Sequence, residues 1–452
     1  MGRLFGTDGI RGRANAYPMD GQTAMAAGRA LAHYFKSRKA SKSHVVIGRD
    51  TRLSGDMLAQ AVGAGICSVG MDLSLIGVVP TPAVAYLTSL SCAAAGVMIS
   101  ASHNPFADNG IKIFNSDGYK LNDAAEDEIE AIMTQADPTP TPHVPPDKIG
   151  RVVQPIHGLD SYLEYLKRVV PHLRMDNLKI VLDCANGATH KAAPELFKDL
   201  GARIVPIFRS PDGININERC GSQYPQALAA TVLTKQADLG LAFDGDGDRL
   251  IAIDEKGVVL TGDQIMAICA NHLMKQGKLK HRTVVSTVMS NMGLGLAMHQ
   301  MGVRLQTTQV GDRYVIQKML DQDAVLGGED SGHIIFRDVH TTGDGLLTAI
   351  RLVDAMVSGG GAEPLSELAK IMTVFPQAMI NVDVLAKPEL TTVPEIVKAI
   401  YAVENELGDK GRVVVRYSGT QSKCRVMVEG PTPELTDTLC RRIATVVRAR
   451  LS

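Results

Sequence analysis

The amino-acid sequence predicts an α/β protein made of three successive α/β units followed by a smaller α+β unit. Its 452 residues, 45% hydrophobic and 21% charged, are enough for three or four cores of about 100–150 residues each. Short apolar runs alternate with helix-length amphipathic stretches along most of the chain, and this pattern changes near residue 370. We place the units at residues 1–152, 153–255, 256–368 and 369–452.

The first unit shows the alternation most clearly. HVVIGRD (44–50) is typical of a strand, residues 57–70 of a helix, and MDLSLIGVV (71–79) of the next strand. This β-α-β order favours a mostly parallel sheet. Residues 124–133 predict a helix with an acidic first turn, which suits its dipole. The five prolines of residues 134–150 then indicate a linker.

The later units follow the same logic. In the second unit a helix is expected over 161–170 and strands over 178–183 and 202–208, and two strands enclose an acidic loop within 237–254. The third unit repeats the alternation and ends near the glycine-rich stretch 359–364, a predicted hinge. The fourth unit has a different pattern, in which strands, one helix and a long C-terminal helix make a small α+β unit.

Charge and composition limit the partners. Lys and Arg number 47 against 48 Asp and Glu, and there is no Trp, so we expect neither nucleic acid nor an anionic membrane as a partner. No run of 18 apolar residues predicts a membrane span, and the N-terminus lacks a signal-peptide pattern. The seven cysteines form no C-x-x-C pair, which is typical of free thiols in a reducing compartment. These features predict a cytoplasmic protein.

An acidic loop, DGDGDR (244–249), lies between the two predicted strands of 237–254. In an extended loop, alternate carboxylates lie on one side, and each pair at about 4 Å repels by roughly 4 kcal/mol near a protein surface. A divalent cation would offset this repulsion, and all-oxygen ligands favour Mg²⁺ or Ca²⁺ over zinc. A solvated acidic turn is the simpler alternative. An EF-hand is excluded, because Arg249 stands where that loop requires glycine and the flanks are strands.

A serine with polar neighbours follows another predicted strand, in GVMISASHNPFADNGIKIF (96–114). Ser102 is followed by His103, Asn104 and Pro105, with Lys112 further on. As a purely structural feature, Ser102 caps a helix and Asn-Pro starts a turn. As a functional one, a serine beside a metal site and arginines can carry a phosphoryl group, which brings a charge of about −1.5 to −2 and three acceptor oxygens.

Four further stretches could bind anions or sugars. RYSGT (416–420) follows a strand and combines an arginine, two hydroxyls and a glycine, although a polar hairpin turn explains it equally well. FGTDGIRG (5–12) and GRDTRLSG (48–55) add arginines in glycine-rich turns. In GGEDSGH (327–333), Glu329 and Ser331 are spaced to grip adjacent sugar hydroxyls, or to cap a turn. The sequence has no Walker A loop, no G-x-S-x-G and no HExxH.

Taken together, the motifs SASHNP, DGDGDR, GEDSGH and RYSGT, in this order, resemble those of the α-D-phosphohexomutase superfamily. FGTDGIRG, NINERCGS (215–222), TVMSN (287–291), VGDRYV (310–315) and TTGDG (341–345) narrow the resemblance to its phosphoglucosamine mutase branch. It covers essentially the whole chain. It implies three related α/β domains with mixed sheets and a C-terminal α+β domain, similar to the TATA-box-binding protein, around a central cleft.

The resemblance also implies an activity: interconversion of glucosamine 6-phosphate and glucosamine 1-phosphate, for UDP-N-acetylglucosamine and cell-wall precursors. The family forms a 1,6-bisphosphate intermediate, and a hexose or glucosamine 1,6-bisphosphate also serves as its activator. The implied partner is a phosphosugar, and the implied assembly is a monomer or homodimer. A phosphoglucomutase or phosphomannomutase of the same superfamily is the alternative, although those usually begin with a TSGxRG-like stretch. A Ca²⁺-binding or sugar-phosphate-sensing module without turnover is the alternative from another class.

Roles are implied for the residues at matching positions. Ser102 would be the phosphoserine, and with Asp244, Asp246 and Asp248 would hold one Mg²⁺ per chain. Arg11, His103, Lys112 and Arg249 would surround the transferred group, with Lys112 a candidate general acid or base. Glu329, Ser331 and His333 would contact the sugar, and the other phosphate would be bound by Arg416, Ser418, Gly419, Thr420 and Arg425. The chain departs from the family pattern at Asp330, Tyr417 and Gln421.

Overall fold

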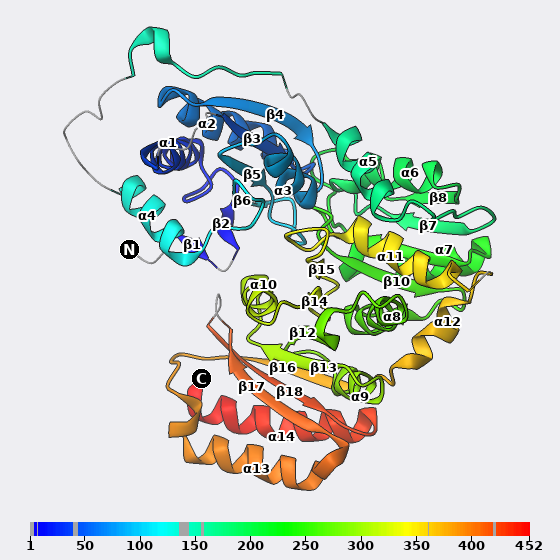
Figure 1. Ribbon diagram of the computed structural model, residues 1–452. Helices are drawn as coiled ribbons and strands as arrows, with labels where there is room; N and C mark the ends of the chain where they lie inside the picture. The colour runs from blue at the N-terminus through cyan, green and yellow to red at the C-terminus, as the bar shows by residue number, and fades with distance from the viewer. Residues whose placement is uncertain are drawn as a thin grey trace.

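A computed structural model describes residues 4–6, 8–38, 44–134, 144–154, 158–359, 361–418 and 422–452 (Figure 1). Four sheets follow one another along the chain, of six, five, four and three strands. Helices flank each sheet, and the last sheet packs with two long helices at the far end of the molecule from the first (Figure 1). The predicted fold class, three α/β units and a C-terminal α+β unit, is confirmed.

The first sheet has the strand order β1-β2-β6-β5-β3-β4. Its central strand β5, AGVMI, is buried along its whole length, as its apolar sequence predicts. Asp20 starts the first helix by accepting a hydrogen bond from the Thr23 amide at 2.8 Å. The elements are β1 (Phe5–Gly6), β2 (Gly9–Arg13), α1 (Gly21–Ser37), β3 (His44–Arg49), α2 (Gly55–Ser68), β4 (Asp72–Val78), α3 (Thr81–Leu90), β5 (Ala95–Ile99), β6 (Asp108–Asn115) and α4 (Asp123–Thr134).

The second and third units have sheets of order β11-β10-β9-β7-β8 and β13-β12-β14-β15. The second unit comprises α5 (Leu159–Val169), β7 (Lys179–Asp183), α6 (Thr189–Asp199), β8 (Arg203–Ile207), α7 (Gln226–Lys235), β9 (Leu239–Phe243), β10 (Leu250–Asp254) and β11 (Val259–Leu260). The third comprises α8 (Gly262–Lys275), β12 (Thr283–Thr287), α9 (Met292–Gln300), β13 (Arg304–Thr308), α10 (Asp312–Asp321), β14 (Leu326–Gly328), β15 (Ile334–Phe336), α11 (Gly345–Val357) and α12 (Leu365–Leu368).

These three units share one topology. Each contains three parallel strands and a fourth that returns antiparallel, in the orders β4-β3-β5-β6, β8-β7-β9-β10 and β13-β12-β14-β15. The sheets are therefore mixed, as the resemblance implies, and the expectation of a mostly parallel first sheet is wrong. The chain between the third and fourth strands is too short for a crossover, so it can only form a hairpin.

The fourth unit is an antiparallel sheet of order β16-β18-β17 with its own core. That core includes Val382, Val426 and Ile443 and is separate from the cluster that the first three units share. The unit contains β16 (Gln377–Asp383), α13 (Pro394–Leu407), β17 (Arg412–Tyr417), β18 (Lys423–Glu429) and α14 (Pro433–Leu451). Short 3₁₀ turns lie at η1 (Pro146–Lys148), η2 (Gly221–Gln223), η3 (Lys280–Arg282), η4 (Ala369–Ile371), η5 (Leu390–Thr392) and η6 (Gly408–Lys410). Within the described ranges, no helix is long and apolar enough to cross a membrane.

Glycines allow α1 and α2 to pack closely, which leads to a stability prediction. A Cβ added to Gly28 would lie 2.1 Å from the Val62 carbonyl oxygen, and one on Gly65 would lie 2.2 Å from that of Met25. Because backbone must move to make room, Gly28→Ala should destabilise the first unit by about 1–3 kcal/mol in urea unfolding. Gly295→Ala in α9 is the matched control. Its Cβ meets only Leu305, at 4.0 Å, so a result equal to that of Gly28→Ala would contradict the packing argument.

Candidate active site

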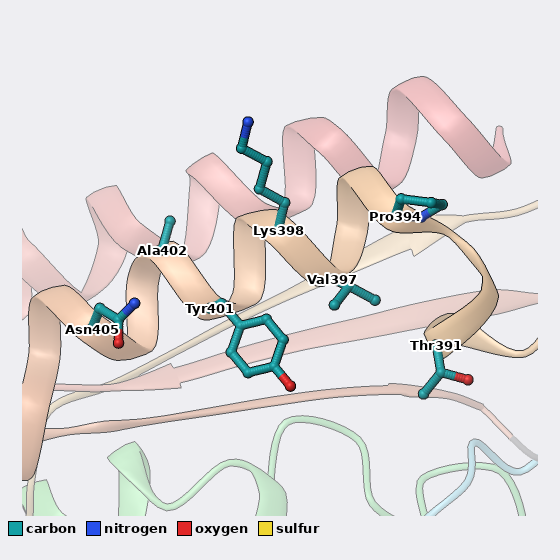
Figure 2. A pocket seen from close by; sticks show the side chains of 7 residues that line it. All are labelled: Thr391, Pro394, Val397, Lys398, Tyr401, Ala402 and Asn405. Carbon is teal, nitrogen blue, oxygen red and sulfur yellow. The ribbon is translucent and has the colours of Figure 1, made fainter.

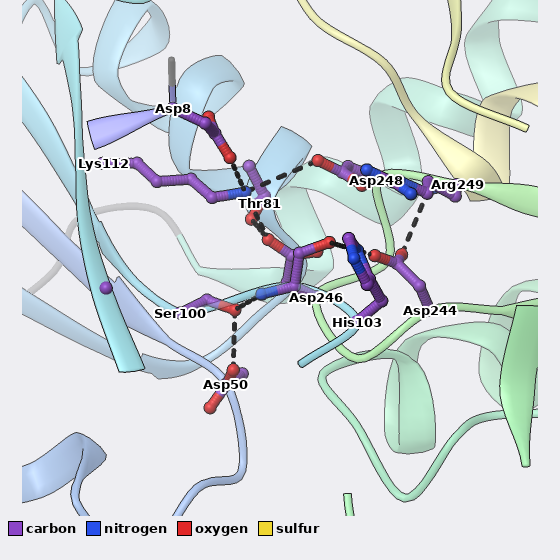
Figure 3. A network of polar contacts seen from close by, with 12 residues as sticks. Asp8, Asp50, Thr81, Ser100, His103, Lys112, Asp244, Asp246, Asp248 and Arg249 are labelled. Atoms are coloured by element: carbon purple, nitrogen blue, oxygen red, sulfur yellow. Dashed lines mark hydrogen bonds and ion pairs between the residues drawn. The ribbon is translucent and has the colours of Figure 1, made fainter. Parts of the chain in front are cut away.

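Equivalent loops of the three α/β units carry Ser102, the Asp triad and the predicted sugar-binding residues. In each unit the loop joins the third strand to the antiparallel fourth, at residues 100–107, 244–249 and 329–333. The first two of these loops come from different sheets and meet in one buried polar network (Figure 3). The repeated topology therefore explains why three motifs, far apart in sequence, share one pattern of apolar strand, polar loop and apolar strand.

Ser102 lies just beyond the end of β5 and is almost fully buried, with 1% of its surface exposed. Its φ of 52° is in the left-handed region, which a non-glycine residue adopts at a cost of about 1–2 kcal/mol. Its hydroxyl donates a hydrogen bond to Asp244 Oδ2 at 2.6 Å, and Oγ lies 3.4 Å from His103 Nδ1. The hydroxyl is thus directed at the acidic loop, and Ser102 does not cap a helix.

The three carboxylates of the acidic loop, Asp244, Asp246 and Asp248, are buried, with ligand oxygens that all lie within 4.8 Å of one another. Burial, and repulsion by its two neighbours, raise the pKa of Asp244. Oδ1 of Asp246 and Oδ1 of Asp248 are buried without a hydrogen-bond partner in the described part of the chain. Buried acceptors of this kind cost free energy unless something binds them. The triad therefore fits a metal ion, and the solvated acidic turn is excluded.

Lysine and arginine side chains surround this acidic centre. Lys112 Nζ lies 2.8 Å from Asp246 Oδ2, 3.2 Å from Asp8 Oδ2 and 3.6 Å from Asp248 Oδ2 (Figure 3). Burial opposes the charge of Lys112, but these carboxylates outweigh it and raise its pKa. Arg249 Nε lies 3.7 Å from Asp248 Oδ1. The centre thus combines anionic ligands with cations that can face phosphate oxygens.

Two further candidates border the same network. Arg11, on β2, forms an ion pair with Asp8, and Asp246 also helps to raise the pKa of its guanidinium, although burial opposes this. His103 lies next to Ser102 in sequence and contacts its Oγ. Burial and the nearby Arg249 lower the pKa of His103 to about 4. The structure therefore brings together Ser102, the Asp triad and all four side chains expected around the transferred group.

The third loop places its residues in different directions. His333 is buried, with Nδ1 3.5 Å from Asp248 Oδ2. It therefore points toward the Asp triad, although it lies in the predicted sugar-binding stretch. Glu329 Oε1 accepts a hydrogen bond from the Gly311 amide at 3.0 Å. Ser331 is exposed at the tip of the loop. Glu329 and Ser331 are therefore left near the surface of the third unit, where a sugar could reach them.

The phosphate motif lies on β17 and β18 of the fourth unit. Arg416 and Arg425 are directly opposite each other across the two strands, and Nε of each is buried without a partner in the described ranges. Burial and repulsion by Arg425 lower the pKa of Arg416. Two adjacent guanidinium groups of this kind favour an anion. Ser418 is buried beside them; Gly419 and Thr420 lie outside the described residues.

Some residues of the centre were missed in the sequence. Lys120 forms ion pairs with Asp8, on the loop between β1 and β2, and with Asp312, at the start of α10. Thr81 Oγ1 donates to Asp246 Oδ2 at 2.6 Å. Asp8 and Asp312 lie inside the quoted stretches FGTDGIRG and VGDRYV, so those stretches contained a signal. Lys120 and Thr81 lie in no stretch that stood out.

One surface pocket is separate from this centre. It has a volume of about 590 Å³ and follows one side of α13 in the fourth unit (Figure 2). The pocket is lined by Thr391, Pro394, Val397, Lys398, Tyr401, Ala402 and Asn405. None of these is a candidate site residue. The polar centre, and not this pocket, is therefore the candidate active site.

Four family models match the chain in order. They are the phosphoglucomutase/phosphomannomutase α/β/α domains I (residues 2–140), II (160–257) and III (261–375), and the phosphoglucomutase/phosphomannomutase C-terminal domain (379–446). Together they cover most of the chain. The protein belongs to the phosphoglucomutase/phosphomannomutase family, the α-D-phosphohexomutases.

Full-length relatives are more specific. The chain is 54% identical over 453 residues to a phosphoglucosamine mutase of Syntrophus aciditrophicus, and 52% identical over 455 residues to one of Syntrophobacter fumaroxidans. Both alignments cover 100% of this chain and 100% of the relative. Among solved structures, a phosphomannomutase-like protein of Thermus thermophilus superimposes with a TM-score of 0.80 at 22% identity, covering 99% of both chains. At that identity the structural match supports the fold alone.

Proposed function

We propose that this protein is a phosphoglucosamine mutase, an isomerase that interconverts glucosamine 6-phosphate and glucosamine 1-phosphate. One observation carries the proposal: the Ser102 hydroxyl donates a hydrogen bond to Asp244, in a buried carboxylate triad in which two oxygens of the described residues accept no hydrogen bond. A serine held against a metal site is suited to carry a phosphoryl group. The full-length identity to phosphoglucosamine mutases supports the choice of substrate.

In the proposed reaction, Ser102 begins as a phosphoserine. The bond between its Oγ and phosphorus breaks as a bond forms to the free hydroxyl oxygen of the substrate, which gives up its proton. The product of this step is glucosamine 1,6-bisphosphate. After this bisphosphate reorients, its other phosphoryl group returns to Ser102, so that the enzyme is restored. His103, whose Nδ1 lies 3.4 Å from Ser102 Oγ, and Lys112 are the candidates to move the proton.

Other residues would bind and orient the substrate. Arg11 and Arg249 would face the oxygens of the transferred phosphate, since their charges lie beside the Asp triad. Glu329, Ser331 and His333 would contact the sugar. The second phosphate would be bound by Arg416, Ser418, Gly419, Thr420 and Arg425. With the two phosphates of the bisphosphate held at opposite ends, one binding site would serve both transfer steps.

Asp244, Asp246 and Asp248, with an oxygen of the phosphorylated Ser102, would hold one Mg²⁺. Oxygen ligands suit this ion, and it keeps coordination positions open for phosphate. When bound, Mg²⁺ offsets negative charge on the transferred group. Lys112 already neutralises part of the charge of the triad through its ion pair with Asp246 Oδ2. Oδ1 of Asp246 and Oδ1 of Asp248, which accept no hydrogen bond from the described residues, would then bind the ion.

The remaining parts of the proposal concern organisation. We divide the chain into domains at 1–152, 153–255, 256–368 and 369–452. The four matched family models support this number and order, whereas β11 (Val259–Leu260), which pairs with β10 in the second sheet, lies beyond the boundary at residue 255. All seven cysteines are free, in keeping with a cytoplasmic enzyme. A hexose or glucosamine 1,6-bisphosphate would act as activator by phosphorylating Ser102. Assembly as a monomer or homodimer stays a prediction.

A comparison of substrates tests the proposed specificity. In coupled assays, kcat/KM should be higher for glucosamine 6-phosphate than for glucose 1-phosphate by about 10-fold or more, because binding groups matched to one sugar lose contacts with the other. A strong preference for glucose 1-phosphate would instead identify a phosphoglucomutase, and a preference for mannose phosphates a phosphomannomutase. Binding of sugar phosphates without turnover would overturn the proposal of an enzyme.

A further inference from the structure

The backbone carbonyls around Ser102 converge on one side chain, Arg52. Its Nη2 donates to the Ser102 carbonyl at 3.0 Å and to the Asn104 carbonyl at 2.8 Å. Its Nη1 donates to the Asp108 carbonyl at 3.0 Å and also to the Pro105 carbonyl. One guanidinium therefore binds three carbonyls of the loop after β5 and that of Asp108, the first residue of β6. It has no N–H group left for a phosphate. The expectation that the arginines of GRDTRLSG form a phosphate grip is wrong for Arg52.

Arg52 is in turn fixed by an ion pair with Asp50. Its side chain is fully buried, and its Nε donates to Asp50 Oδ2 at 2.8 Å. The same carboxylate oxygen accepts a hydrogen bond from Ser100 Oγ at 2.6 Å, and Ser100 Oγ accepts one from the Ser102 amide at 2.9 Å (Figure 3). Both backbone groups of Ser102, its N–H and its C=O, are thus tied to the Asp50–Arg52 ion pair.

A second side chain binds the same carbonyls from another unit. Asn217 Nδ2 donates to the Ser102 carbonyl at 2.9 Å and to the Asn104 carbonyl at 3.0 Å. Gly245, in the acidic loop, packs so closely here that a Cβ on it would lie 2.5 Å from the Ser102 carbonyl oxygen and 2.7 Å from Asn217 Nδ2. The loops of Ser102 and of the Asp triad therefore meet at the point where Asn217 binds.

The loop needs such support for two physical reasons. Ser102 has a left-handed backbone, which an L-residue keeps only when its surroundings fix it. Four carbonyl oxygens that point toward one place also repel one another unless a multiple donor lies between them. A planar guanidinium with five N–H groups meets this need, whereas the compact ammonium of lysine has three. Nothing in these contacts requires a substrate.

We propose that Arg52 and Asn217 are positioning residues, which hold the Ser102 backbone so that its Oγ lies against the Asp triad during phosphoryl transfer. This inference rests on the proposed function of Ser102. It gives two of the quoted stretches a role. Arg52, in GRDTRLSG, binds the loop of Ser102 from within the first domain, and Asn217, in NINERCGS, binds it from the second domain. Neither side chain need touch the substrate, so the clamp should affect transfer and not binding.

Conservative variants separate positioning from binding. Arg52→Lys and Asn217→Asp keep the size of each side chain but remove carbonyl contacts, and a shift of Ser102 by about 1 Å can cost about 10²-fold in rate. We therefore expect kcat to fall by about 10²-fold in each variant, with KM for glucosamine 6-phosphate little changed. Arg441→Lys and Asn405→Asp, at exposed positions of the fourth unit, are the matched controls and should behave as wild type.

Chemical rescue provides a readout that a merely structural role would not give. In Arg52→Ala, millimolar guanidinium should enter the vacated carbonyl pocket and raise kcat by about 10-fold or more, whereas guanidinium should not restore Ser102→Ala. Asn217→Asp keeps the test valid if Arg52→Ala does not fold. Wild-type kcat in both Arg52→Lys and Asn217→Asp would overturn the clamp, as would losses that appear only in KM. Full activity of Ser102→Ala would instead overturn the proposed function, so the two failures are distinguishable.

Discussion

Replacing Ser102 by alanine should lower kcat for the interconversion of glucosamine phosphates by about 10⁴-fold or more, since it removes the atom that carries the phosphoryl group. The Ser102 hydroxyl donates a hydrogen bond to Asp244 at 2.6 Å. Within the described ranges, no other hydroxyl group contacts Asp244 from a loop that follows a strand. Steady-state kinetics in a coupled assay, with saturating Mg²⁺ and 1,6-bisphosphate, measure the loss.

The control for this variant is Ser89→Ala, at an exposed position at the end of α3, which should keep wild-type kcat. Thermal unfolding should show that Ser102→Ala still folds, with a loss of stability of about 1–3 kcal/mol, because Asp244 Oδ2 loses the hydrogen bond from the Ser102 hydroxyl. Ser102→Ala with wild-type kcat would contradict the phosphoserine mechanism, whatever its stability.

Loss of the metal should have the second largest effect. Treatment with EDTA should abolish turnover, and added Mg²⁺ should restore it. Asp246→Asn should lower kcat by about 10²-fold or more and raise the Mg²⁺ concentration needed for half-maximal rate, because a neutral amide both binds the cation less well and offsets less charge. The position is informative because Asp246 Oδ1 has no partner in the described chain, whereas its Oδ2 already accepts from Lys112 and Thr81.

Asp147→Asn is the control for the charge change, since Asp147 is 75% exposed and lies 4.0 Å from its nearest cation, on Lys148. The rate of this variant should depend on the Mg²⁺ concentration in the same way as that of the wild type. An enzyme that keeps its full rate in EDTA, or an Asp246→Asn variant with an unchanged Mg²⁺ dependence, would show that the triad does not hold the catalytic metal.

Much of the site could be predicted because it lies in short loops after apolar strands. The strand before Ser102 and the strands around DGDGDR are apolar except for Asp254 at the end of β10, so the polar residues between them stood out. The predicted helix at 57–70 and strand at 71–79 appear as α2 (Gly55–Ser68) and β4 (Asp72–Val78). Side-chain chemistry alone suggested that the loops belonged together, because a phosphoserine needs cations.

The support of the site could not be predicted in the same way. Arg52 lies 50 residues before Ser102, and Asn217 lies 115 residues after it, so the contacts depend on the packing of two domains. Arginine in a glycine-rich turn has the same local pattern whether it binds phosphate or carbonyls. The direction of His333, toward Asp248, depends on how the third sheet meets the second. The return strands β6, β10 and β15 are antiparallel because their connections are short, which a pattern of apolar runs does not reveal.

The central claim is that Ser102 carries the phosphoryl group, and its most direct test is a mass measurement on the peptide that contains this residue. Enzyme mixed with glucosamine 1,6-bisphosphate and Mg²⁺, then quenched in acid, should carry one phosphate on Ser102. If that phosphate comes from isotope-labelled bisphosphate, a chase with unlabelled glucosamine 6-phosphate should move the label from Ser102 into the sugar phosphates at a rate no slower than kcat, while Ser102 is phosphorylated again in each cycle. Turnover that proceeds while Ser102 stays unphosphorylated in the quenched enzyme, or a label that stays on Ser102 through many turnovers, would contradict the account.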